Sequence, residues 1–158
     1  MRSEQTQLLD LISAEFPAAP AHADLSLRQA DEIDSFSAPT PDVAPADWRD
    51  VPEHDLEEHH WGFTHLDAKS WRFYLPVFLA YSVRHLSRGD SLVIAACLSN
   101  LRPPDRIPSR FTTLSDGQRQ TVVSVLEFLA FDSESDFMAD ACQVLEEYWI
   151  ERPLYPDA

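Results

Sequence analysis

Residues 70–82 read SWRFYLPVFLAYS, the longest apolar run of the chain and its densest group of aromatic side chains. A surface helix carries one apolar stripe, but here the apolar positions continue around the helix. No residue from Phe73 to Val83 is charged, yet this segment is shorter than the roughly 20 residues that cross a hydrocarbon core. We therefore expect a central helix buried in protein and no membrane span. Its buried side chains should be Trp71, Phe73, Tyr74, Leu75, Val77, Phe78, Ala80 and Tyr81.

Pro76 interrupts this run. Proline has no amide hydrogen to donate to the carbonyl of Arg72, and its ring crowds that carbonyl. The sequence therefore predicts either a kink at Pro76 or the start of a second helix there. A kinked core helix is the simpler expectation. The alternative is that the open Arg72 carbonyl, beside three aromatic rings, lines a ligand pocket.

Composition favours an all-α fold. The 158 residues suit one domain, and three glycines against twelve prolines argue against barrels and sandwiches, which need glycine-rich turns. The three glycines are too far apart to form a loop that binds nucleotides. We expect a single domain over residues 1–158, with about six or seven helices around the kinked aromatic helix. A proline-rich loop at 37–46 and a tail at 153–158 should complete it.

Helix boundaries are marked by capping residues. Ser115 and Gln118 form a capping box that starts a helix over 116–130, and Asp67 caps the central helix. Asp24 or Ser26 should start a helix that ends near Ser35, and Asp132 or Ser133 should start the last helix. Buried positions expected in the second helix and after Ser91 include Leu25, Ala30, Ile33, Phe36 and Leu92.

The formal net charge of −15 is unevenly distributed. Residues 61–119 carry eight basic and four acidic side chains, whereas the rest of the chain carries four basic and twenty-three acidic ones. This excess disfavours nucleic-acid binding, which needs clustered Lys and Arg, and it attracts basic partners. We expect the carboxylates of two acidic segments to bind a basic protein. They are Asp47, Asp50, Glu53, Asp55, Glu57, Glu58, Glu134, Asp136, Asp140 and Glu147.

The first acidic segment also contains histidines. Glu57 and His60 have the Glu-x-x-His spacing of half a di-iron site, and His54 and Glu58 lie one helical turn apart. A di-iron bundle needs a second such pair on an apolar helix, which the sequence lacks. We therefore expect a solvated acidic turn here, with no metal and no cofactor.

Neither the two cysteines nor the arginines of one loop require a functional site. Cys97 and Cys142 lie in apolar helical patterns and are expected to be reduced core cysteines. Three arginines occupy the loop 102–110, which could hold a phosphate or carboxylate. In so acidic a chain, arginines paired with its own acidic helices are the simpler expectation.

Several segments together resemble a bacterial family known as domain of unknown function 6714. The likeness spans most of residues 5–149, and it depends on Asp47-Trp48-Arg49-Asp50, Trp71-Arg72-Phe73-Tyr74-Leu75-Pro76, Phe111-x-x-Leu114-Ser115-x-x-Gln118-Arg119 and Val125-Leu126-Glu127-Phe128-Leu129. The resemblance implies the fold but no activity or site residues. The acidic histidine cluster and the loop 37–46 look like departures from the family pattern.

The sequence contains no motif that is typical of a catalytic site. There is no glycine-x-serine-x-glycine elbow, metal set or activated nucleophile, so we expect no enzyme. The sequence instead suggests a cytoplasmic acidic protein-binding module, an immunity protein that occludes the basic surface or active site of a cognate bacterial toxin. One alternative is a small metal- or ligand-dependent enzyme at Pro76 or at Glu57 and His60. Another is an adaptor or scaffold; the oligomeric state is left open.

Overall fold

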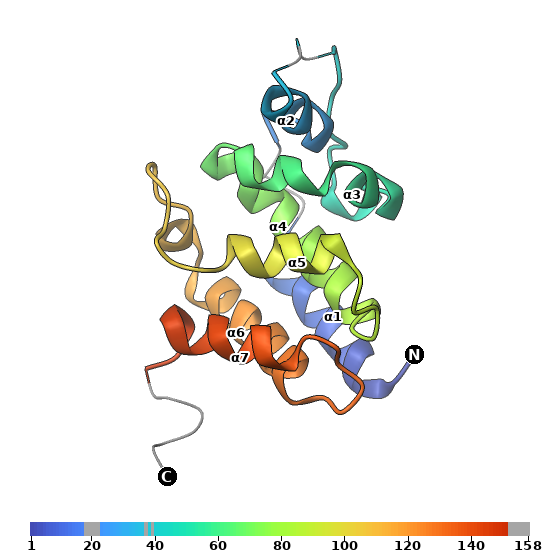
Figure 1. Cartoon of the computed structure of the whole chain (residues 1–158), viewed down its shortest axis with the longest axis vertical. Helices are drawn as coiled ribbons and strands as arrows, with labels where there is room; N and C mark the ends of the chain where they lie inside the picture. The colour runs from blue at the N-terminus through green and yellow to red at the C-terminus, as the bar shows by residue number, and fades with distance from the viewer. Residues whose placement is uncertain (18–22, 37, 39, 152–158) are drawn as a thin grey trace.

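The structure, a computed structural model, describes residues 1–17, 23–36, 38 and 40–151. Within these ranges there are helices and no strands, which confirms the predicted all-α fold (Figure 1). Outside the described residues lie the predicted tail at 153–158, residues 37 and 39 of the predicted proline-rich loop, and residues 18–22. The helices are α1 (Ser3–Glu15), α2 (Leu27–Asp34), α3 (Glu53–His59), α4 (Ala68–Arg84), α5 (Leu92–Asn100), α6 (Asp116–Phe131) and α7 (Met138–Val144).

Helix α4 is the centre of the fold, as its apolar run predicts. It contacts α1, α5 and α6, while α2 and α3 lie toward one end of the molecule and α6 and α7 toward the other (Figure 1). Every residue from Phe73 to Val83 is buried. The ring of Phe63, from the short 3-10 helix His60–His65, stacks on Phe78 with 4.0 Å between ring centroids. Apolar side chains on all sides of α4 therefore meet covering elements.

Pro76 lies inside α4, which continues through it as one helix. The structure therefore excludes the interpretation in which a second helix begins at Pro76. Proline cannot supply the helical hydrogen bond to the carbonyl of Arg72, and the packing of the surrounding helices maintains the helix without it.

Predicted caps have the expected geometry. The Ser115 hydroxyl accepts from the amide of Gln118 at 3.1 Å, and the Gln118 side chain accepts from the amide of Ser115 at 3.0 Å. The same reciprocal pair forms at Ser26 in front of α2, and the Asp67 carboxylate caps α4. Local hydrogen bonding thus set these three helix starts, which is why the sequence could predict them.

Other boundaries and buried positions differ from the predictions. The last helix begins at Met138, because residues 132–137 form turns in which the amide of Asp136 donates to the carbonyl of Leu86. It ends in a π-helical turn, Leu145–Trp149. Leu92 is 55% exposed, since it occupies the solvent side of the first turn of α5. Ile33, in the last turn of α2, and Phe36, two residues after that helix, are also exposed, because no described element packs over them.

Candidate functional site

The predicted partner-binding carboxylates fall into several separate groups. Three of them, Glu53, Glu57 and Asp136, lie around the turn at 85–91 that joins α4 to α5. Glu53 and Glu57 are one turn apart on α3, and Asp136 reaches the turn from the segment before α7. The fold thus joins the two acidic segments, which are far apart in sequence, at one place.

Each of these three side chains is anchored by hydrogen bonds or ion pairs. Glu53 Oε2 lies 2.9 Å from His85 Nε2, and Asp136 Oδ2 accepts from the amide of Gly89 at 3.1 Å. Glu57 Oε1 accepts from the Tyr81 hydroxyl at 3.0 Å. Because their positions are fixed, these carboxylates lose little conformational freedom when a partner binds them.

Asp90 completes this group, and the sequence analysis did not select it. It is exposed in the same turn, next to Gly89, but it lies in the stretch of the sequence where basic residues outnumber acidic ones. We call Glu53, Glu57, Asp90 and Asp136 the acidic rim. Two arginines lie against it: Arg84 is 3.5 Å from Glu53 and Arg88 is 3.6 Å from Glu57, so the rim keeps an excess of two negative charges.

The remaining predicted carboxylates lie elsewhere. Asp47 caps a 3-10 turn, Trp48–Asp50, and pairs with Arg49, while Asp50 is exposed. Asp55 and Glu58 lie on another face of α3, over a hollow of about 340 Å³ beside α2. Around α7 the predicted residues are Glu134, which is 3.6 Å from Arg2, the exposed Asp140, and Glu147.

The arginine loop only partly follows the expectation of pairing with acidic helices. Arg102 donates twice to Glu147, at 2.7 and 3.0 Å, and this contact lowers the pKa of that carboxyl. Arg110 is buried and donates instead to the backbone carbonyls of Thr64 and Leu66. Burial, together with the nearby charge of Arg106, lowers the pKa of Arg110 to about 10. These two carbonyls lie at and just after the end of the 3-10 helix His60–His65, far from Arg110 in sequence, so the sequence does not reveal this arrangement.

The side chains that the sequence suggested as possible metal ligands make other contacts in the structure. The Glu57 carboxylate contacts Tyr81 and Arg88, and His60 is buried with Nδ1 3.2 Å from the backbone carbonyl of Glu57. His54 pairs with Asp55 instead of Glu58. In the described part of the chain, no three His, Cys, Asp or Glu side chains gather closely enough to hold a metal ion.

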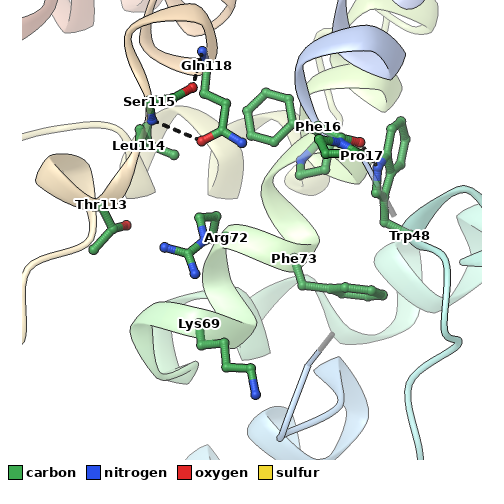
Figure 2. A pocket seen from close by; sticks show the side chains of 11 residues that line it. Phe16, Pro17, Trp48, Lys69, Arg72, Phe73, Thr113, Leu114, Ser115 and Gln118 are labelled. Atoms are coloured by element: carbon green, nitrogen blue, oxygen red, sulfur yellow. Dashed lines mark hydrogen bonds between the residues drawn. The ribbon is translucent and has the colours of Figure 1, made fainter. Parts of the chain in front are cut away.

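A pocket of about 370 Å³ opens beside Pro76 (Figure 2). Arg72 and Pro76, which the sequence analysis considered for a pocket, are both among its lining residues. Its walls come from the first half of α4, the two residues after α1, the 3-10 turn with Trp48, and residues 113–118, which lead into α6. The lining residues are Phe16, Pro17, Trp48, Lys69, Arg72, Phe73, Pro76, Thr113, Leu114, Ser115 and Gln118.

The pocket is apolar with two cations and no lining carboxylate among the residues described. In Figure 2, Arg72 lies between Thr113 on one side and Phe16 with Pro17 on the other, while Lys69 points away from Arg72. Lys69 pairs with Asp24 at 3.0 Å. Arg72 is half-buried and has no hydrogen bond or ion pair within the described ranges of the chain.

Comparison with known proteins identifies a family and nothing more specific. The model of a family described as a family of unknown function, DUF6714, matches residues 4–153, which confirms the resemblance found in the sequence. No curated protein and no solved structure matches the chain. Among the helices that the structure describes, none is both long and apolar enough to span a membrane.

Proposed function

This chain belongs to the DUF6714 family, and we propose that it is an acidic protein-binding module, an immunity protein that neutralises a cognate bacterial toxin by covering a basic surface. The observation that carries the proposal is the acidic rim, where two acidic segments meet around one turn. Toxins that act on nucleic acid need basic clefts to bind phosphates, and a carboxylate-rich surface complements such a cleft.

The geometry of the rim supports binding to cationic side chains. Glu57 uses only Oε1 in its contacts with Tyr81 and Arg88, and Asp136 uses only Oδ2 in its contact with Gly89. The second oxygen of each carboxylate can still accept a hydrogen bond from an arginine or lysine of a partner. The acidic rim is therefore both fixed in position and able to bind, as complementary interfaces require.

The test removes three of the four negative charges of the rim and keeps an acceptor oxygen at each changed position. The variant Glu57→Gln, Asp90→Asn and Asp136→Asn is compared with a control that changes net charge equally on other surfaces, Asp10→Asn, Glu127→Gln and Glu151→Gln. Binding to the product of the adjacent gene is measured by calorimetry. A growth assay measures protection when the two proteins are produced together.

The rim variant should bind more weakly and protect less, and the control variant should behave like the unmodified protein. Affinity of the unmodified protein should fall between about 0.1 M and about 1 M salt, as the screening length drops from about 10 to about 3 Å. Equal binding by both variants, or binding that does not respond to salt, would count against the proposal. Binding without protection would favour the adaptor alternative, which uses the same surface.

A further inference from the structure

We propose that the pocket beside Pro76 binds a small organic carboxylate, one whose negatively charged head is attached to an aromatic or aliphatic body. This site is separate from the acidic rim, which lies beyond the opposite end of α4. The proposal does not depend on the immunity function.

The charge of the ligand follows from Arg72. Its guanidinium borders the pocket and has no partner within the described ranges, although the chain carries 27 acidic residues. A half-buried guanidinium is stabilised by a planar anion that accepts two parallel hydrogen bonds, and a carboxylate has that geometry. Since no described lining residue is acidic, a ligand carboxylate meets attraction here and no repulsion from the walls.

The apolar body of the ligand follows from the walls. Phe16, Trp48, Phe73, Pro76 and Leu114 supply apolar surface, and the Trp48 ring is fixed because its Nε1 donates to the carbonyl of Phe16 at 2.6 Å. Ligand pockets are typically about 300–1,000 Å³, lined by apolar and aromatic side chains with few polar groups. At about 370 Å³ this pocket is at the small end of that range, which indicates a compact ligand.

Most polar groups at the edge of the pocket already have hydrogen-bond partners, so few remain for an uncharged ligand. The Thr113 hydroxyl donates to the carbonyl of Arg110 at 2.6 Å, and Gln118 is occupied by the capping box and by the carbonyl of Glu15. The Ser115 hydroxyl accepts from the Gln118 amide and keeps its own hydrogen for donation. A doubly charged phosphate would leave most of its oxygens against apolar walls, which is unfavourable. Arg72 with Ser115 therefore suits one carboxylate.

The experiment measures the binding of phenylacetate and octanoate, each beside its uncharged amide, to the whole chain by calorimetry. We expect at least one carboxylate to bind, and its amide to bind about tenfold more weakly or worse, as expected for loss of a hydrogen bond to a charged group. Arg72→Gln should weaken the carboxylate by about the same factor and leave the amide unchanged. Arg28→Gln, a matched change of an exposed arginine on α2, should alter neither.

Thermal unfolding checks that the Arg72→Gln protein is folded. If it is not, Leu114→Phe provides an independent test, because the larger ring fills the pocket and should abolish binding of both carboxylate and amide. The proposal is overturned if neither carboxylate binds the unmodified protein. It is also overturned if the folded Arg72→Gln protein, or the Leu114→Phe protein, binds carboxylate as the unmodified protein does.

Discussion

Replacing Phe78 by alanine tests whether α4 is the packed centre of the fold. Phe78 is fully buried and stacks on Phe63. An aromatic side chain buries at least about 150 Å², and about 25 cal/mol per Å² gives roughly 4 kcal/mol, within the roughly 3–5 kcal/mol measured for such truncations, which include the cavity left behind. Urea unfolding should show a loss of this size in the free energy of unfolding.

A control substitution separates loss of core packing from loss of an aromatic ring. Phe131, at the end of α6, is 51% exposed, and Phe131→Ala should change the free energy of unfolding by less than about 1 kcal/mol. A loss at Phe78 as small as that at Phe131 would refute the reasoning, because it would mean that the segment 70–82 does not form the interior. The unfolding slope should stay constant in both variants, so that the midpoints can be compared.

Three further predictions concern a cap, a carboxylate and the cysteines. Ser115→Ala should cost about 1 kcal/mol in urea unfolding, because it removes the cap of α6; a serine to alanine change at an exposed position within a helix, such as Ser99 in α5, should cost less. Burial acts to raise the pKa of Asp105, but hydrogen bonds from a serine hydroxyl and backbone amides outweigh it and lower that pKa. Its contribution to stability is therefore present above the unfolded value near 3.9 and lost as pH falls through the lower folded value. Unfolding midpoints of Asp105→Asn and the unmodified protein should differ at pH 7 and converge in acid; a constant difference would contradict this. Burial raises the pKa of Cys97 to about 12, so a thiol reagent at pH 8 should modify it only after denaturation, and rapid reaction of Cys97 in the native protein would be the contrary result.

The two proposed sites can operate independently. The pocket lies along the first half of α4, from Lys69 to Pro76, and the acidic rim surrounds the turn after its last residue, Arg84. Pro76 and Arg84 are eight positions apart, and a helix rises about 1.5 Å per residue, so about 12 Å separates the pocket from the end of α4 along the helix axis. A small carboxylate in the pocket therefore need not block a protein on the rim.

Local chemistry made much of the fold predictable. The apolar run around Phe78 predicted the central helix, and the reciprocal bonds of Ser115 and Gln118 predicted the start of α6. These features depend on residues three or four positions apart, which the sequence displays directly. The start of α7 was missed because the amide of Asp136 pairs with the carbonyl of Leu86, a contact between segments distant in sequence.

The same distinction between local and long-range features applies to the two proposed sites. By itself, the sequence determined that the chain is acidic, helical and built around aromatic residues, and that Pro76 leaves a carbonyl without its helical partner. Only the tertiary structure decided that Glu57 and Asp136 reach the turn that carries Asp90, and that Arg72 borders a pocket walled by Trp48. The reason is physical: charge and helical periodicity are carried by each segment, whereas a surface or a cavity exists only where separate segments pack together.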